Sequence, residues 1–314
     1  MRVLIAGAGA VGGYFGGLLL RAGRDVTLLA RGAHAAALRA HGLRVRSYRE
    51  GTFSVRPPVV TSLAEAAESP RAPFDLIIVA VKAPDLDALA RDLAALGPRL
   101  LGERGVVMPL LNGVESEEVL AAALGPSRVV GAVAHVGAEL TAPGQLDHTT
   151  RGEILVSQLP GQPSGRAREV AAFLQQSQVP GDYHENLAFI SWRKLVWNSA
   201  FNAVTALTDT TMGAAARHPR LRALLSAAMR ETIAVATAEG VTLPDGMVET
   251  MLALGEQYGD ARTSMHQDVL SGRTTEHDAL NGVVGRRGRK HGITTPVNDT
   301  LTALLDGRRV THKT

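Results

Sequence analysis

The feature that most constrains this chain is a glycine-rich turn near its beginning. The turn consists of Gly7, Ala8, Gly9, Ala10, Val11 and Gly12, and it follows directly on the apolar run Arg2–Ala6. In a dinucleotide-binding turn of this spacing, the first glycine permits the tight strand-to-helix bend, the second lets the backbone approach a pyrophosphate, and the third lets the helix pack closely on its strand. The free N–H groups of the helix then point at the phosphates. We therefore predict a cofactor site between a first strand, a helix over Val11–Arg21 and a second strand over Asp25–Ala30.

The residue after the second strand indicates which dinucleotide the site takes. An NAD site usually has an acidic residue about twenty positions past the glycines, where it binds the ribose 2′-hydroxyl, whereas a 2′-phosphate needs a cation. In this chain the strand ends at Arg31, followed by Gly32. A planar guanidinium can make two parallel hydrogen bonds to a phosphate. We therefore predict NADPH/NADP+ as the cofactor; the alternative is that Arg31 is a solvated surface residue in an arginine-rich chain.

The length and composition predict two domains and restrict the class of protein. A chain of 314 residues is longer than one compact core usually requires. We expect an NADP-binding, Rossmann-type domain over 1–182 and a helical, substrate-binding domain over 183–314. The fold class is α/β, with an N-terminal doubly wound sheet and a second, all-helical C-terminal domain.

Several classes of function are disfavoured by the composition. The chain has no cysteine, which excludes disulfides, thiolate nucleophiles and cysteine-ligated zinc, and its ten histidines show no paired spacing for a metal. No apolar run approaches the roughly 20 residues of a membrane span. The first strand leaves no room for a signal peptide, so we expect a cytoplasmic protein. The net charge is only +3, and the basic run 286–291 has no interleaved aromatic residues, so we expect no nucleic-acid partner.

Strands and helices alternate along the first half, which is typical of a doubly wound parallel sheet. The apolar runs Asp75–Val81 and Gly105–Leu111 are expected to be strands buried on both faces. Lys82 and Asn112 directly follow these runs. Because ligands bind at the carboxyl ends of such strands, we expect both residues to share one cofactor cleft with the glycine turn and Arg31. A further strand is expected over 129–133, a hairpin from Gly144–His148 and Glu153–Val156, and a helix over 164–176.

The second half is predicted to be almost entirely helical, and one of its helices carries a polar stripe. Lys194, Asn198 and Asn202 are each four positions apart within an otherwise apolar helix. Amides and a cation in such surroundings need partners, and a lysine beside apolar groups can have its pKa lowered, which suits a proton donor. The alternative is that the stripe is the wet face of the helix. The polar runs 263–268 and 272–276 are consistent with loops.

Taken in order, these motifs resemble those of the ketopantoate reductase family over essentially the full length. The motifs are the glycine turn, Arg31-Gly32, Val81-Lys82, Asn112-Gly113, the lysine-asparagine stripe, Ser264-Met265-x-Gln267-Asp268, Glu276 and Gly292-Ile293-x-Thr295-Pro296-x-Asn298. The family reduces 2-dehydropantoate to pantoate with NADPH, on the route to pantothenate and coenzyme A. The resemblance implies that Lys194 is the general acid and that Glu276 orients the lysine and the substrate.

The resemblance also implies the remaining roles. Asn198, Asn202 and Ser264 would hold the hydroxy acid, and Lys82, Asn112 and Glu276 would lie beside the ribose and nicotinamide of the cofactor. One departure concerns the segment Thr208–Met212, where some family members have a further substrate-binding asparagine. This leaves open a related reductase of another branched 2-oxo acid. A non-catalytic NADP sensor is a third alternative, although it has no use for Lys194 or Glu276. For an enzyme of this family, we expect the partner to be a small 2-oxo acid, and a homodimer is one candidate assembly.

Overall fold

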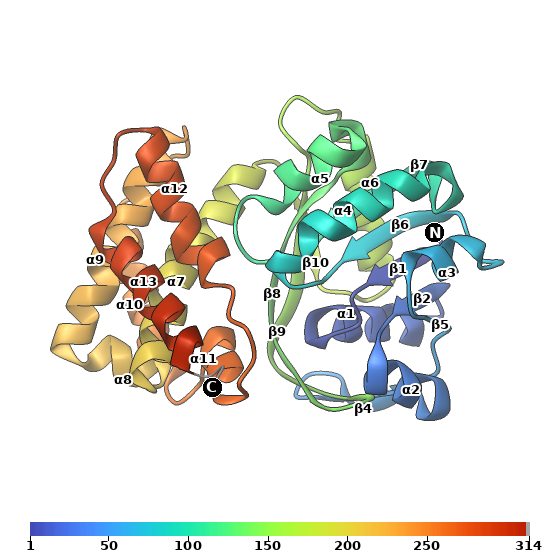
Figure 1. Cartoon of the computed structure of the whole chain (residues 1–314), viewed down its shortest axis with the longest axis horizontal. Coiled ribbons are helices and arrows are strands. Elements are labelled where there is room, and N and C mark those ends of the chain that lie inside the picture. The colour runs from blue at the N-terminus through green and yellow to red at the C-terminus, as the bar shows by residue number, and fades with distance from the viewer. Residues whose placement is uncertain (312–314) are drawn as a thin grey trace. The chain divides into compact units, whose positions relative to one another are not determined.

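The protein consists of two compact units in the computed structural model, which describes residues 1–311 (Figure 1). Unit 1 comprises Met1–Leu111 and Glu115–Leu187, and unit 2 comprises Asn112–Val114 and Ala188–Thr314, of which 312–314 lie outside the described residues. The prediction of a parallel-sheet domain followed by a helical domain is confirmed. The predicted boundary between 182 and 183 falls inside strand β10 (Gly181–His184), which pairs with β9 of unit 1.

A five-stranded parallel sheet forms the centre of unit 1, in the order β5-β2-β1-β6-β7. Its strands are β1 (Val3–Ala6), β2 (Val26–Leu29), β5 (Val59–Val60), β6 (Phe74–Val79) and β7 (Leu101–Pro109). The helices of unit 1 are α1 (Ala10–Arg21), α2 (Gly32–His41), α3 (Leu63–Glu68), α4 (Leu86–Leu96), α5 (Ser116–Leu124) and α6 (Gly165–Gln176), with 3-10 turns η1 (Ala83–Asp85), η2 (Gly97–Arg99) and η3 (Pro126–Arg128).

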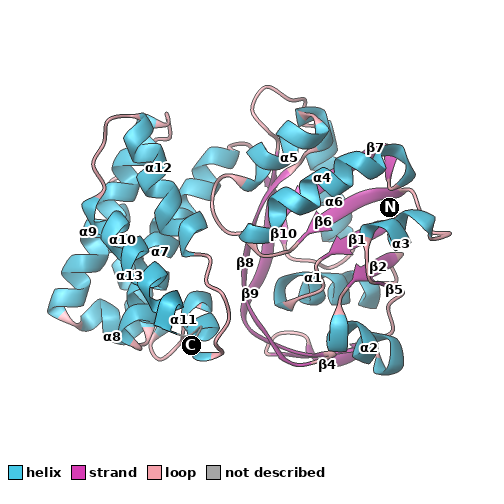
Figure 2. Cartoon of the chain, in the orientation of Figure 1, coloured by secondary structure: helices cyan, strands magenta, loops and turns pink. Residues whose placement is uncertain are grey.

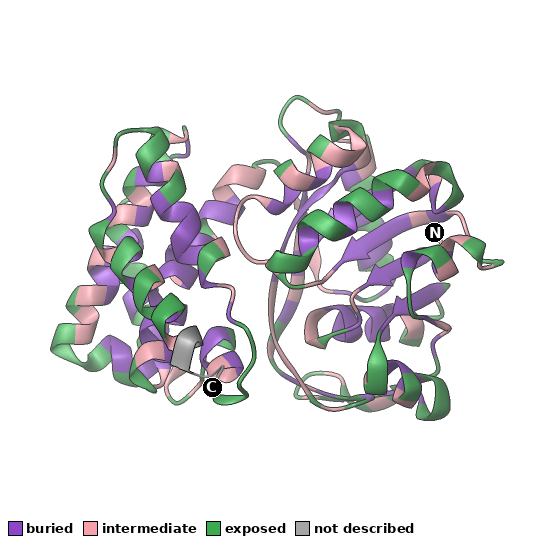
Figure 3. Cartoon of the chain, in the orientation of Figure 1, coloured by how far each residue is buried: buried purple, intermediate pink, exposed green. Residues whose placement is uncertain are grey.

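Strand β1, at the centre of this sheet, is apolar throughout because both of its faces are covered (Figure 3). In β1, Val3 and Ile5 join a core that contains Phe15 of α1, while Leu4 and Ala6 join a separate core with α4 and α5. All four residues of the strand are fully buried. Successive side chains of a strand point to opposite faces, so a strand between two cores needs an uninterrupted apolar run.

A second sheet in unit 1 packs against α1 and corrects one prediction. It contains β3 (Leu43–Ser47), β4 (Gly51–Val55), β8 (Gly131–Ala142), β9 (Gln145–Ser157) and β10. The expected hairpin between Gly144–His148 and Glu153–Val156 is wrong, because both segments belong to the single strand β9, which pairs with β8. Arg151 and Gly152 have positive φ angles of 56° and 106°, at a shift of register opposite β8. The polar, glycine-containing sequence therefore forms a bulge within a strand rather than a turn between two strands.

Unit 2 is built from helices (Figure 2). They are α7 (Leu187–Thr208), α8 (Met212–Arg217), α9 (Pro219–Ala238), α10 (Met247–Tyr258), α11 (Ser264–Leu270), the π-helical turn η4 (Asp278–Gly282), α12 (Val283–Lys290) and α13 (Pro296–Thr311). The polar run 263–268, for which the sequence is consistent with a loop, instead forms the N-cap and most of α11. Thr263 caps this helix by accepting the N–H of His266 at 3.2 Å. The π turn η4 leads directly into α12.

A buried polar network joins four helical segments of unit 2. Asn281 of η4 donates to the carbonyl of Ser199 in α7 at 2.6 Å and to Oδ1 of Asn298 in α13 at 2.9 Å. Glu231 of α9 accepts the backbone N–H groups of Val297 and Asn298 at 2.8 and 2.9 Å, and Nδ2 of Asn298 at 2.8 Å. The carboxylate of Glu231 therefore supplies the hydrogen-bond acceptors that the first turn of α13 lacks.

Within residues 1–311, no helix combines the length and the hydrophobicity needed to cross a membrane. Within the same residues, no group of three or more histidine, aspartate or glutamate side chains is arranged to hold a metal ion.

Candidate functional site

The glycine turn joins β1 to α1, and two of its glycines are required by the fold. Gly7 has a φ of +109°, and a Cβ atom there would lie 2.7 Å from the carbonyl oxygen of Ala80. A Cβ at Gly12 would overlap the carbonyl oxygen of Gly7 and lie 2.8 Å from Cγ2 of Ile5. Any larger residue at either position would therefore strain the turn or push α1 away from the sheet.

Gly9 is different, because nothing in the fold requires a glycine there. Its φ of −71° is ordinary for any residue, and a Cβ atom would meet no atom within 4 Å. Gly9 is the N-cap of α1, no side chain caps this helix, and its first turn contains no acidic residue. An open, uncapped helix N-terminus favours an anion, and a missing side chain lets that anion approach the backbone. The turn thus fits the pyrophosphate of a dinucleotide.

Two exposed cations follow β2 and β6, the strands on either side of β1. Arg31 is the N-cap residue of α2, two positions after β2 ends at Leu29. Lys82 precedes η1, three positions after β6 ends at Val79. Because β2, β1 and β6 are adjacent and parallel, their carboxyl ends meet at one edge of the sheet. The structure therefore brings both cations to the same edge of unit 1 as the glycine turn.

In unit 2, the predicted polar stripe lies on α7, and most of it is buried. Asn198 is 7% exposed and Asn202 is 3% exposed, so the alternative of a wet helix face is wrong for these two residues; Lys194 is half-buried. Oδ1 of Asn202 accepts hydrogen bonds from Oγ of Ser264 at 3.4 Å and from the backbone N–H of Met265 at 3.3 Å. Two residues that are 62 positions apart in the sequence are thus joined, and Nδ2 of Asn202 remains available as a donor.

Asn112 and Glu276 also lie together in unit 2. Nδ2 of Asn112 donates to Oε2 of Glu276 at 3.2 Å, across 164 positions of sequence. The neighbouring Gly113 has a φ of +102°, and a Cβ there would lie 2.8 Å from the carbonyl oxygen of Ala279 in η4. The segment Asn112–Val114 is therefore fitted closely against the π turn that follows Glu276. π turns within helices occur frequently at functional sites.

The structure adds a histidine beside Glu276 that the sequence did not single out. His277 is fully buried, with Nδ1 2.7 Å from Oγ1 of Thr275 and Nε2 2.9 Å from Oδ1 of Asp306. Thr275 directly precedes Glu276 and Asp306 lies on α13, so this histidine ties the segment around Glu276 to α13. No motif could have indicated it, because Asp306 is 29 positions away in the sequence.

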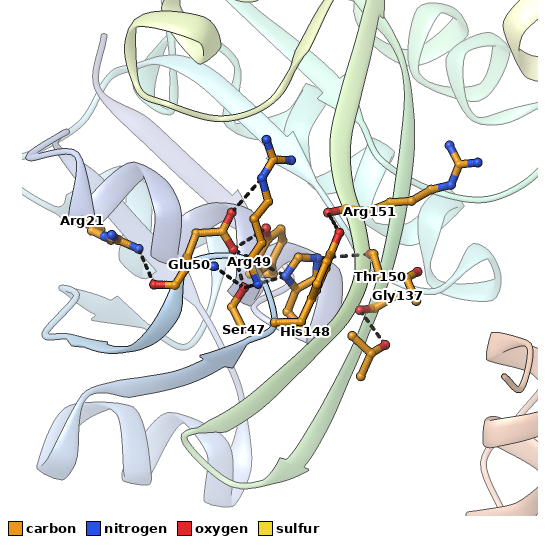
Figure 4. A network of polar contacts seen from close by, with 11 residues as sticks. Arg21, Ser47, Arg49, Glu50, Gly137, His148, Thr150 and Arg151 are labelled. Carbon is orange, nitrogen blue, oxygen red and sulfur yellow. Dashed lines mark hydrogen bonds and ion pairs between the residues drawn. The ribbon is translucent and has the colours of Figure 1, made fainter. Parts of the chain in front are cut away.

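A second group of ionisable residues lies in unit 1, around His148 of β9 (Figure 4). Nδ1 of His148 is 2.9 Å from Oγ of Ser47, Nε2 is 3.1 Å from the carbonyl of Thr150, and Glu50 also contacts Ser47. The hydroxyl of Tyr14 in α1 donates to Glu50 at 3.2 Å. Burial lowers the pKa of His148 and raises the pKa of Tyr14. This cluster ties α1 to the second sheet and contains none of the predicted site residues.

Comparison with known families and proteins gives matches over both units. The family model for ketopantoate reductase PanE/ApbA matches residues 3–161, and the model for its C-terminal part matches residues 186–309. The 2-dehydropantoate 2-reductase of Halobacterium salinarum is 34% identical over 307 residues, which cover 97% of this chain and 98% of the relative. That of Mesorhizobium japonicum is 32% identical, with 97% of each chain covered.

Solved structures agree. A PanE/ApbA family ketopantoate reductase from Ralstonia eutropha superimposes with a TM-score of 0.89, at 33% identity and with 100% of both chains covered. A ternary complex of D-mandelate dehydrogenase with NADH and anilino(oxo)acetate gives a TM-score of 0.90 at 26% identity, covering 100% of this chain and 99% of that one. The predicted resemblance and the prediction of an oxidoreductase are confirmed by these relatives. The chain belongs to the ketopantoate reductase PanE/ApbA family.

Proposed function

We propose that the protein reduces 2-dehydropantoate to pantoate with NADPH. The relatives named 2-dehydropantoate 2-reductase support the substrate. The observation that carries the proposal is that unit 1 contains an open, uncapped glycine turn, and unit 2 contains buried amides, a lysine and a carboxylate. The first suits a dinucleotide, and the second suits a small, polar 2-oxo acid. The proposal places the reaction in the cytoplasm, on the route to pantothenate and coenzyme A.

The cofactor would be held by the turn from Gly7 to Gly12 and by charged groups at the sheet edge. The backbone at Gly9 and the N-terminus of α1 suit the pyrophosphate, and the exposed guanidinium of Arg31 suits the 2′-phosphate. Lys82, Asn112 and Glu276 are proposed to bind the ribose and nicotinamide portion. When bound, NADPH supplies the hydride that reduces the C2 ketone.

The remaining chemistry belongs to residues of unit 2. Lys194 donates a proton to the oxygen at C2, and general acid catalysis of this kind contributes about 10²–10⁴ in rate. Asn198 and Asn202 donate their amide N–H groups to the carboxylate and hydroxyl oxygens of the substrate. Because Oδ1 of Asn202 already accepts from Ser264 and Met265, the amide is held with its N–H groups turned outward from that contact. Glu276, which accepts a hydrogen bond from Asn112, orients the lysine.

The cofactor part of the proposal is tested by replacing Arg31 with alanine. A charged hydrogen bond contributes about 1.5–3 kcal/mol, so R31A should weaken NADPH binding roughly 10- to 150-fold and leave NADH binding nearly unchanged. Dissociation constants are measured by fluorescence titration. The matched control is R39A, which removes an exposed arginine from the same helix. Equal weakening of both cofactors by R31A would count against a 2′-phosphate site.

A second candidate is an NADH- or NADPH-dependent reductase of another branched or aryl 2-oxo acid. The similarity to the D-mandelate dehydrogenase complex favours it, as does the segment after α7. There Asp209 has a φ of +51° and contacts Nε2 of His266 at 2.7 Å, and Thr211 caps α8. Both side chains thus have structural partners. Oxidation of NADPH with phenylglyoxylate but not with 2-dehydropantoate would select this candidate.

A homodimer is the proposed assembly, and light scattering coupled to gel filtration tests it.

A further inference from the structure

His34 in the first turn of α2 has a hydrogen-bond partner on each ring nitrogen. Nε2 lies 2.8 Å from the carbonyl oxygen of Ala8, and the backbone N–H of Gly144 lies 3.0 Å from Nδ1. A carbonyl can only accept and a backbone N–H can only donate. These two partners therefore fix the ring as a neutral imidazole that carries its proton on Nε2 and accepts at Nδ1.

One partner, Ala8, lies in the glycine turn itself, and the other, Gly144, lies in the connection between β8 and β9. Ala8 lies between Gly7 and Gly9, and its N–H donates to the carbonyl of Leu29 at 2.9 Å. The turn is thus held on one side by the end of β2 and on the other by His34. His34 also follows Arg31, the N-cap of the same helix, by one turn.

We propose that His34 is a positioning residue of the dinucleotide site, which holds the glycine turn against the helix that carries Arg31 and does so only in its neutral form. This inference rests on the proposed NADP site, because it assigns a support to that site. A protonated ring would present an N–H at Nδ1 to the N–H of Gly144. Two donors would then face one another, the contact to Gly144 would be lost, and the histidine would no longer be held in place beneath Ala8.

The surroundings of His34 favour the neutral ring at neutral pH. Burial lowers the pKa of His34 from its ordinary value, and the hydrogen bond to Ala8 opposes this shift only in part. The contacting segments 7–9 and 141–145 carry no ionisable side chain, and neither does β5, which also packs against α2. The other ionisable side chains of α2 and its N-cap are Arg31, Arg39 and His41, and Arg39 pairs with Glu65.

The test uses H34Q, whose amide can donate to the carbonyl of Ala8 but does not titrate. The control is H41Q, which changes an exposed histidine at the other end of α2. Dissociation constants for NADP+ are measured on the full chain at pH 8.0 and pH 5.5. A 2′-phosphate gains a proton near pH 6 in every sample. The comparison of wild type with H34Q therefore isolates the contribution of His34.

At pH 8.0, H34Q should bind NADP+ nearly as tightly as wild type, whereas H34L, which has no donor, should bind more weakly. On acidification, wild type and H41Q should lose about three- to tenfold more affinity than H34Q. An equal loss in wild type and H34Q would overturn the proposal.

A measurement without nucleotide separates this inference from the proposed function. Hydrogen exchange of segments 7–17 and 32–41 is followed by mass spectrometry at both pH values, with correction for intrinsic rates. Wild type should lose protection at pH 5.5 relative to H34Q. The same protection in both proteins would overturn the inference regardless of what the wild type binds. Lost protection in a wild type that binds no NADP+ would support the role of His34 and refute only the assignment of the cofactor.

Discussion

Replacing Gly9 with alanine separates the needs of the fold from the needs of the cofactor. The new methyl group would meet no protein atom within 4 Å, and a φ of −71° suits alanine. Alanine is a slightly poorer N-cap than glycine but restricts the unfolded chain, and these effects oppose each other. We therefore expect the free energy of unfolding to change by less than about 1 kcal/mol, which corresponds to less than about 4 °C in Tm for a domain of this size.

The effect on the cofactor should be much larger. The methyl group would occupy the space at the N-terminus of α1 where the pyrophosphate is proposed to lie. Loss of one charge-assisted hydrogen bond costs about 1.5–3 kcal/mol, or roughly 10- to 150-fold in the dissociation constant for NADPH. Fluorescence titration measures the binding and differential scanning fluorimetry the stability.

Two further variants calibrate this result. G165A adds a methyl group at another open position, at the start of α6 in the same unit, and should change neither property appreciably. G12A, whose Cβ would overlap Gly7, should destabilise the fold by at least about 1–3 kcal/mol. A well-folded G9A protein that binds NADPH as tightly as wild type would refute the placement of the pyrophosphate.

Three other results are expected. K194A should lower kcat with 2-dehydropantoate about 10²–10⁴-fold while NADPH binding is retained. The control R193A removes the exposed cation next to Lys194 and should leave kcat nearly unchanged. An unchanged kcat in K194A would reject Lys194 as the general acid. E231A should lower the free energy of unfolding, measured by urea denaturation, by about 2–4 kcal/mol, because three N–H donors at the start of α13 lose their acceptor. A change below about 0.5 kcal/mol would contradict this role of Glu231. Burial lowers the pKa of His148 and His34 below the ordinary value of 6.5 in the folded state, so the unfolded chain binds protons more readily near that pH. The stabilisation from these two residues is therefore complete above pH 6.5 and is lost as the pH falls below it. A Tm that does not fall between pH 7.5 and pH 5.5 would be inconsistent with this.

The parts of the fold that the sequence predicted well are those with a single local cause. Continuous apolar runs identified β1, β6 and the second half of β7, because both faces of these segments are buried. The glycine turn was identified because its spacing reflects steric demands at Gly7 and Gly12 within one turn. The residues of the candidate site were named by ordered motifs, and the structure joins two pairs of them, Asn202 with Ser264 and Asn112 with Glu276.

The parts that escaped prediction depend on contacts between distant segments. The bulge at Arg151 and Gly152 looked like a turn because its residues are polar, and only the pairing with β8 reveals one continuous strand. Helix α11 is seven residues long and mostly polar, so no apolar periodicity marks it. His34 and His277 owe their roles to backbone and side-chain partners far away in sequence, which no spacing encodes.

We propose that this protein is an NADPH-dependent reductase of 2-dehydropantoate. The most direct test follows the absorbance of NADPH as it is oxidised by a panel of 2-oxo acids, including 2-dehydropantoate and phenylglyoxylate, with NADH as the alternative cofactor. We expect the highest kcat/KM for 2-dehydropantoate with NADPH. Failure to oxidise NADPH with any 2-oxo acid would contradict this proposal.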